Sequence, residues 1–213
     1  MVILTTEDIV NIMRIVVNTI EENRQYFCDL DSIAGDGDFG SSLEKGFSEI
    51  KTKWNSLDKS NIGTFMRDCG MIIMENCGGA TGPIWGNAFL NASRFSKDKV
   101  SLNIKELSEF FQSMVDGVKK VGKAELGDKT LLDSLIPFTN SLAKSAENGE
   151  HIEQGFLKAL RKAEEGSKTT KTIVASKGRA RYLGTRSIGA YDPGARAVVV
   201  IFSSINEKFF DNN

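Results

Sequence analysis

The chain has few helix-breaking residues, and those it has are gathered in short segments. Among 213 residues there are only three prolines, and 13 of the 20 glycines fall within residues 35–40, 78–86, 122–127 and 178–194. The longer stretches between these clusters contain few of either residue type, which is typical of helices joined by a few specialised loops. We therefore expect a mainly helical protein.

Cysteine, histidine and net charge are equally scarce. The three cysteines, Cys28, Cys69 and Cys77, form no Cys-x-x-Cys pair, which argues against a disulfide framework or a zinc site and favours a cytoplasmic location. The net charge of −1 leaves no basic surplus for binding nucleic acid or a membrane surface. The lone His151 lies in a polar turn, which excludes a Ser-His-Asp mechanism within the chain.

Two kinds of hydrophobic segment are also missing. No run approaches 18 apolar residues, so we expect no membrane-spanning helix. Residues 1–7 lack a basic region followed by an apolar stretch, so they do not resemble a secretory signal. The hydrophobic fraction of 40% is nevertheless that of a globular protein.

Apolar residues recur at steps of three and four, which predicts amphipathic helices. Residues 5–8, Thr-Thr-Glu-Asp, resemble a capping box that opens the first helix. Residues 197–202 have the β-branched content of a buried strand, but no partner strand is visible, so we interpret 196–210 as a buried helix. About eight helices predict a single all-α bundle domain over residues 1–213. The other expected helices cover residues 9–20, 42–53, 62–76, 85–95, 104–118, 128–147 and 152–165.

Three aspartates stand in the most unusual segment, residues 31–40. It matches G-x-G-x-x-G formally, but the aspartates would repel a pyrophosphate, and the spacing does not fit an EF-hand. Packing Asp31, Asp36 and Asp38 together needs a cation, and hard oxygen ligands select Mg²⁺ or Ca²⁺. The alternative is a solvated turn in which an aspartate caps the following helix.

Two further segments have features that suit phosphate binding. The glycine-rich residues 78–83 leave backbone N–H groups accessible ahead of a helix, although tight turns between helices also use glycine. Residues 177–186 carry three arginines and a lysine, which suit phosphate oxygens or a solvated basic loop. Residues 117–124 only approach a P-loop, because Ala124 replaces the required Ser or Thr. Gly127-Asp-Lys-Thr130 looks like another helix start, with Asp128 as its N-cap.

Taken in order, these segments resemble the nucleotide-binding L subunit of dihydroxyacetone kinase. The matching stretches are residues 35–38, 78–83, 127–133, 177–189 and 192–195, so the resemblance covers essentially the whole chain. It implies an antiparallel barrel of eight helices with a nucleotide at one end. It also implies a transfer of a phosphoryl group that needs no covalent residue.

The resemblance also implies a set of site residues. Asp31, Asp36 and Asp38 would hold two Mg²⁺ ions, and Arg179 would be the catalytic residue that reaches the phosphates. The residues that would contact the ADP or ATP cofactor are Phe39, Gly40, Ser41, Ser42, Ala80, Thr81, Gly122, Leu131, Arg179, Asp192, Pro193 and Gly194.

Departures and missing parts qualify the expected role. Phe39 stands where the family usually has His, and Ser41-Ser42 where it has Thr-Asn, so a related keto-sugar such as a tetrulose is an alternative substrate. The chain lacks the substrate-binding K domain, so the expected partners are a separate K subunit and a phosphocarrier of the phosphotransferase system, and a homodimer is a further option. A nucleotide-sensing regulatory module without transfer activity is the rival interpretation. A metal-dependent hydrolase lacks a base outside the three aspartates.

Overall fold

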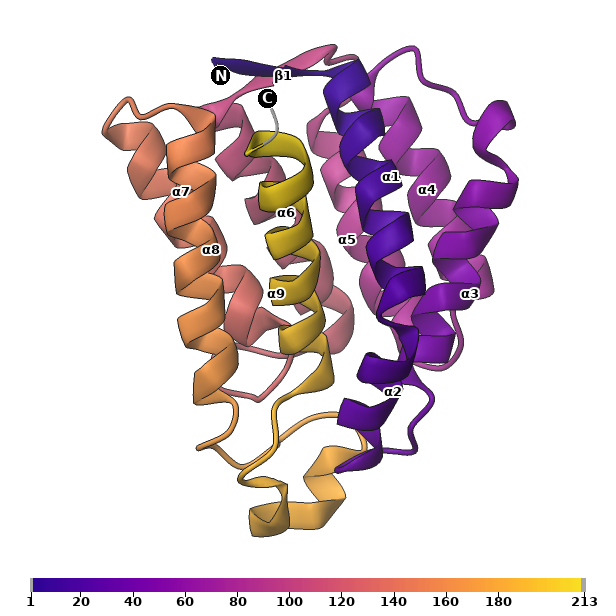
Figure 1. Ribbon diagram of the computed structural model, residues 1–213, viewed down its shortest axis with the longest axis vertical. Helices are drawn as coiled ribbons and strands as arrows, with labels where there is room; N and C mark the ends of the chain where they lie inside the picture. Colours follow the sequence, from indigo (N-terminus) through magenta and orange to yellow (C-terminus); the bar gives the residue numbers. More distant parts are fainter. Residues whose placement is uncertain (1, 212–213) are drawn as a thin grey trace.

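Eight antiparallel helices form a closed ring in the computed structural model, which describes residues 2–211 (Figure 1). Around the ring each helix packs on the next, in the order α1, α3, α4, α5, α6, α7, α8 and α9, and α9 returns to α1. The short α2 lies outside this order, beside the start of α3. The helices are α1 (Thr6–Glu22), α2 (Arg24–Ser32), α3 (Phe39–Thr52), α4 (Ile62–Asn76), α5 (Thr81–Phe95), α6 (Ile104–Gly122), α7 (Leu132–Glu147), α8 (Ile152–Thr169) and α9 (Pro193–Ile205).

One end of the ring is closed by a two-stranded antiparallel ladder. Strand β1 (Ile3–Thr5) pairs with β2 (Ser101–Asn103), so each strand leads directly into a helix, α1 or α6. Both helices begin with a capping box. The N-cap side chain accepts from the backbone N–H three residues later, and the acidic side chain of that later residue accepts from the N-cap backbone N–H. We call this the closed end of the barrel; the opposite end, below α2 in Figure 1, carries longer loops.

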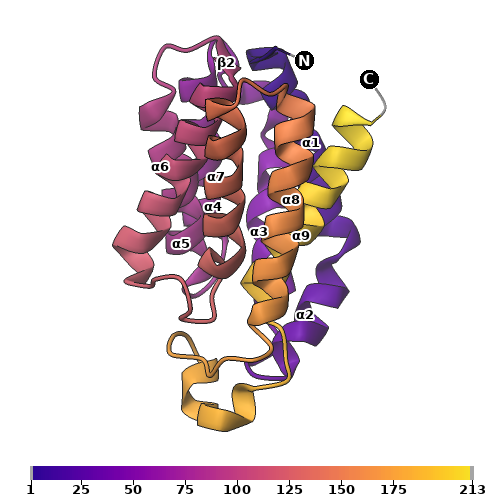
Figure 2. The same cartoon turned by 90° about the vertical axis from the view of Figure 1, so that its left-hand side faces the viewer.

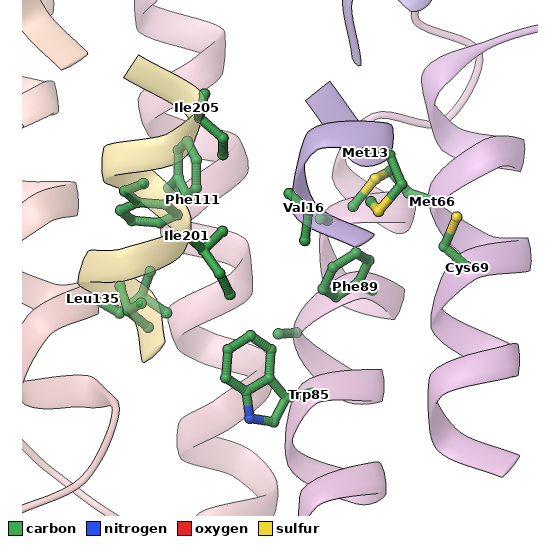
Figure 3. Packing of buried hydrophobic residues seen from close by; sticks show 14 of the residues in the cluster. Met13, Val16, Met66, Cys69, Trp85, Phe89, Phe111, Leu135, Ile201 and Ile205 are labelled. Atoms are coloured by element: carbon green, nitrogen blue, oxygen red, sulfur yellow. The ribbon is translucent and has the colours of Figure 1, made fainter. Parts of the chain in front are cut away.

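The inner faces of the helices form one continuous apolar core. Phe111 of α6, Phe138 of α7 and Phe202 of α9 pack with ring centroids 4.3–5.5 Å apart, which joins helices distant in sequence. Figure 3 shows side chains from both walls of the barrel facing one another, with Phe111 and Ile201 on one side and Val16 and Phe89 on the other. A small apolar cavity of about 110 Å³ lies between them.

The sequence predicted the class and most helices correctly. The expected all-α fold is confirmed, residues 197–202 lie in the helix α9, and the three cysteines are buried. His151 is exposed, as expected from its polar turn. Among residues 2–211 no helix is both long and apolar enough to cross a bilayer. The single domain over 1–213 stays a prediction, and Met1, Asn212 and Asn213 lie outside the described residues.

Several boundaries were wrong. Helix α2 and the short strands were not predicted, because α2 has few apolar residues and its N-cap makes no side-chain hydrogen bond. Helices α3 and α5 begin earlier than expected, inside the glycine clusters, and α8 continues through Gly166. A Cβ at Gly166 would overlap the Asp133 carbonyl, so this glycine allows α7 and α8 to approach closely and does not end the helix.

Candidate functional site

A cleft of about 600 Å³ opens at the end of the barrel opposite the ladder. Its walls come from the loops before α3, α5 and α7, from the start of α9, and from the segment between α8 and α9. This segment contains a 3₁₀ helix (η2, Ala180–Ser187). Figure 2 shows this segment below the barrel, across from the start of α7. The predicted site residues that line the cleft are Asp31, Asp36, Asp38, Phe39, Ala80, Thr81, Gly122, Leu131, Arg179, Asp192, Pro193 and Gly194.

The aspartate loop is organised by the carboxylate of Asp31. One oxygen, Oδ2, accepts from the backbone N–H groups of Gly37 (2.9 Å), Asp38 (3.1 Å) and Phe39 (3.4 Å). Gly37 has a φ of +77°, which favours glycine, and a Cβ at Gly35 would overlap the Asp31 side chain. The chain thus wraps around a half-buried anion.

The same wrapping brings three carboxylates together. Asp31, Asp36 and Asp38 each offer an oxygen, and these oxygens all lie within 4.8 Å of one another, with Asp36 and Asp38 exposed. Asp38 precedes α3 but makes no side-chain capping hydrogen bond, so the alternative of a simple helix cap does not describe this loop. Like charges this close favour a bound cation, and three oxygen donors fit Mg²⁺.

Arg179 faces the carboxylates from the other side of the cleft. Its guanidinium makes an ion pair with the Asp36 carboxylate, although its side chain is 63% exposed. The neighbouring basic residues make other contacts: Lys177 lies 3.8 Å from Asp128, and Arg181 donates to the Tyr182 hydroxyl at 2.6 Å. Of this basic loop, Arg179 is the residue placed to meet an anion held by the aspartates.

Sequence reasoning missed a buried lysine at the base of the cleft. The Lys129 ammonium donates to the carbonyl oxygens of Thr170 (2.6 Å), Ser187 (2.6 Å) and Ala190 (2.8 Å), and the side chain is only 3% exposed. Burial lowers the pKa of Lys129, while the negative charges of Asp192 and Asp133 oppose that shift. Lysine is usually solvated, so the sequence gives no signal for this position beyond its place in the segment 127–130.

The turn before α7 is held by Asp133, whereas Asp128 was wrongly predicted to cap this helix. The Asp133 carboxylate accepts from the N–H groups of Gly127 and Thr130, both at 2.7 Å, and burial raises its pKa. Asp128 instead accepts from Glu125 N–H (2.8 Å) and from the Ser176 hydroxyl (2.5 Å). It therefore ties the turn to the basic loop and leaves the start of α7 to Asp133.

Asp192 caps α9 at the far side of the cleft. Its carboxylate accepts from Ala195 N–H at 2.7 Å, and Pro193 fills the first helical turn. Burial raises the pKa of Asp192 to about 7; the charges of Asp133 and Asp31 add to this effect, while the Ala195 N–H opposes it. This carboxyl group therefore titrates near neutral pH.

Three predicted residues do not line the cleft. Gly40 is buried where α3 meets α2, and a Cβ there would overlap the Arg24 carbonyl. The Ser41 hydroxyl lies 3.5 Å from the sulfur of Cys28, and the Ser42 hydroxyl donates to the Gly78 carbonyl at 3.0 Å. These side chains hold α3 to its neighbours, and a contact between their backbone and a nucleotide stays a prediction.

Comparison with known proteins identifies the family of this chain. A family model described as the DAK2 domain matches residues 33–207. The chain belongs to the DAK2 domain family. It is 35% identical over 202 residues to the PEP-dependent dihydroxyacetone kinase, ADP-binding subunit DhaL, of Escherichia coli K12, covering 95% of this chain and 96% of the relative. It is 33% identical to the PTS-dependent ADP-binding subunit DhaL of Lactococcus lactis, covering 88% and 90%.

Longer proteins contain a similar DAK2 domain as one part. The dihydroxyacetone kinase from C. freundii in complex with AMP-PNP and Mg²⁺ superposes with a TM-score of 0.71 at 25% identity, covering 93% of this chain and 33% of that chain. An L-erythrulose kinase of Pectobacterium atrosepticum is a more distant relative, 29% identical over 83% of this chain and 30% of its own length. The chain therefore spans about a third of these larger kinases.

Proposed function

We propose that this chain is the ADP- or ATP-binding subunit of a dihydroxyacetone kinase and transfers a phosphoryl group to a short ketose. The observation that carries the proposal is the ion pair across the cleft: a cluster of three carboxylates faces Arg179, with room for a nucleotide beside them. The names of the relatives that match nearly end to end, both ADP-binding subunits of such kinases, support it.

Each wall of the cleft has a role in this proposal. Asp31, Asp36 and Asp38 would hold two Mg²⁺ ions, which supply positive charge to the phosphates. Arg179 would grip the transferring group in a bidentate manner and neutralise the charge that develops on it. Leu131 and the segment 192–194 would border the nucleoside, opposite the glycine-rich start of α5.

The acceptor sugar requires a second protein. In this proposal a substrate-binding K subunit presents the ketose at the open cleft, and a phosphocarrier of the phosphotransferase system recharges the bound ADP in the cytoplasm. The Escherichia coli relative is named PEP-dependent and the Lactococcus lactis relative PTS-dependent, which favours a phosphocarrier over free ATP as the donor.

A tetrulose kinase subunit is the second candidate. It is favoured by Phe39, which packs on Phe27 with ring centroids 6.2 Å apart and so presents an apolar ring where the family resemblance implies an imidazole. The L-erythrulose kinase resembles the chain less closely than the ADP-binding subunits do, so dihydroxyacetone is the preferred acceptor. A transfer assay distinguishes these two kinase subunits from a regulatory module that transfers no phosphoryl group.

Retention of nucleotide tests the proposal. We expect protein mixed with ADP and Mg²⁺ to keep ADP through gel filtration, and to lose it when EDTA is present. Phe39→His should slow release several-fold, since one added polar contact contributes about 1 kcal/mol. Protein that emerges nucleotide-free, with no calorimetric affinity for ADP in Mg²⁺, would overturn nucleotide binding.

A reconstituted transfer assay then identifies the donor and the acceptor. The purified chain, a K subunit and the phosphocarrier should convert dihydroxyacetone to its phosphate, with L-erythrulose as the competing acceptor. Activity that follows added ATP without a phosphocarrier would show ordinary nucleotide exchange. Nucleotide binding without transfer to either sugar would favour the regulatory module.

A further inference from the structure

The segment that carries Arg179 is fastened at both ends to one buried nitrogen. Residues 170–192 link α8 to α9, and Lys129 donates to Thr170 at the start of this segment and to Ser187 and Ala190 near its end. A fourth carbonyl, that of Ile173, lies 3.4 Å away. One ammonium group thus joins two stretches of chain that are about 20 residues apart.

The number of donors matches the number of close acceptors. An ammonium has three N–H groups, and three carbonyl oxygens lie within 2.8 Å of it. The Lys129 backbone has a φ of +60°, an uncommon value for a residue with a side chain, and Asp133 fixes the surrounding turn through two N–H groups. The turn that carries Lys129 is therefore also held in place.

The rest of the segment contrasts with this anchored base. Two contacts brace it close to the lysine: Ala175 N–H donates to the Ser187 hydroxyl (3.0 Å), and Gly189 N–H donates to the Lys171 carbonyl (2.8 Å). Further out the chain is mostly exposed and is tied to the turn before α7 through Ser176 and Asp128, while the Arg179 guanidinium makes its ion pair across the cleft with Asp36. The position of Arg179 thus depends on this tie and on how firmly the base of the segment is held.

We propose that Lys129 is a positioning residue for Arg179, which clamps the base of the basic loop through its three carbonyl contacts. The inference rests on the proposed phosphoryl transfer and deepens it, because it names the group that keeps the arginine over the carboxylates. Loss of the clamp should leave the barrel intact and lower turnover about 10- to 100-fold, since misplacing a catalytic group by about 1 Å has effects of this size.

The first test does not depend on activity. Hydrogen exchange of Lys129→Met should show the amides of Ala175 and Gly189 exchanging at least about tenfold faster, while α7 and α8 keep their protection. Lys171→Met is the matched control, because Lys171 lies on the same segment but is exposed, with its ammonium 5.1 Å from the Tyr191 ring. Unchanged exchange in Lys129→Met would overturn the clamp.

The second test asks whether Lys129 acts through Arg179. In the complete kinase, Lys129→Met should lower kcat in the wild-type background but have almost no additional effect in an Arg179→Ala background. The affinity for ADP should change by less than threefold in the same variant. Equal losses of kcat in both backgrounds would overturn the positioning role.

The two tests also separate this inference from the proposed function. A wild-type chain that binds no ADP defeats the proposed function, whereas the exchange measurement still decides the clamp. Lys129→Gln keeps two donors without the charge and should give an intermediate effect, which covers the case in which Lys129→Met fails to fold. If circular dichroism showed both variants without native helix content, the whole barrel would need Lys129 and the local role would be wrong.

Discussion

The two ends of the barrel finish their helices in different ways. At the closed end, α1, α4 and α6 each begin with a side-chain cap, in which an oxygen of Thr5, Asn61 or Asn103 accepts from a backbone N–H. Two of these caps are reciprocal, and the β1–β2 ladder joins their helices. Of the four helices that begin at this end, α8 lacks a side-chain cap, so the first backbone N–H groups find side-chain partners in three of the four.

At the cleft end, α9 has the Asp192 cap, whereas the N-cap residues of α3 and α5 make no side-chain hydrogen bond. Asp38 and Ala80 stand at the N-cap positions, and glycine-rich segments precede both helices. The loops here are organised by charges instead: the Asp31 carboxylate collects three N–H groups, and the Lys129 ammonium collects three carbonyl groups. The comparison teaches that the closed end is built for stability, while at the cleft end the start of α5 is left available to an anion.

The largest effect in this comparison should come from the aspartate cluster. Asp36→Asn or Asp38→Asn should abolish Mg²⁺-dependent binding of ADP, because a neutral amide weakens the hold on the cation that screens the phosphates. Without metal the variants should be as stable as the wild type or slightly more stable, since like charges are removed. Calorimetry with ADP and Mg²⁺ provides the measurement.

Asp29→Asn is the matched control for that experiment. Asp29 is exposed on α2, two residues before Asp31, and accepts only from Gln25 (2.8 Å) among the side-chain contacts that the described residues give it. Its variant should bind ADP normally. Unchanged affinity in Asp36→Asn and Asp38→Asn would remove the metal site.

The next effect concerns the arginine across the cleft. Arg179→Lys should lower kcat about tenfold while changing the affinity for ADP less, because lysine keeps the charge but loses the planar fork. Arg186→Lys, in the same loop but away from the cleft wall, should leave both quantities unchanged. Parallel losses of turnover and affinity in Arg179→Lys would make Arg179 a ground-state binder.

Two smaller effects are expected when a helix cap is removed at the closed end and a carboxylate is added to a helix start at the cleft end. Asn103→Ala removes a cap at the closed end and should lower the free energy of unfolding by about 1 kcal/mol without affecting ADP binding. Ala80→Asp adds a carboxylate at the start of α5 and should change that free energy by less than about 1 kcal/mol but weaken ADP binding by repelling phosphate. Urea unfolding and calorimetry on both variants check the prediction.

A separate effect at the cleft end is a pH dependence at Asp192. Its pKa of about 7 in the folded protein exceeds the ordinary 3.8, so between these values the folded chain holds a proton that the unfolded chain has lost. Stability from this group is therefore complete at acid pH and falls as the pH rises to 7. Asp192→Asn keeps a capping oxygen and should flatten that fall, as measured by urea midpoints from pH 4 to pH 8. A wild-type slope preserved in the variant would assign the dependence elsewhere.

The sequence predicted the closed end better than the cleft end. Local patterns predicted two of its helices: an apolar stripe placed the start of α6, and a stripe together with a capping box placed the start of α1. The aspartate cluster was also predictable, because the three carboxylates lie within eight consecutive residues, 31–38. The Lys129 contacts were not, since carbonyl oxygens belong to every residue, and only the fold brings those of Thr170 and Ala190 to one nitrogen.

The ring is completed by a helix that is distant in sequence from its partner. Helix α9 lies between α8 and α1, and its apolar residues face those of both neighbours. During synthesis α1 emerges from the ribosome long before α9, so its inner face waits for a late partner, and such exposed surface is what chaperones recognise. Contacts between residues this far apart in the sequence also slow folding. Because Asp192 and Pro193 start α9, one border of the cleft becomes complete only when the barrel itself closes.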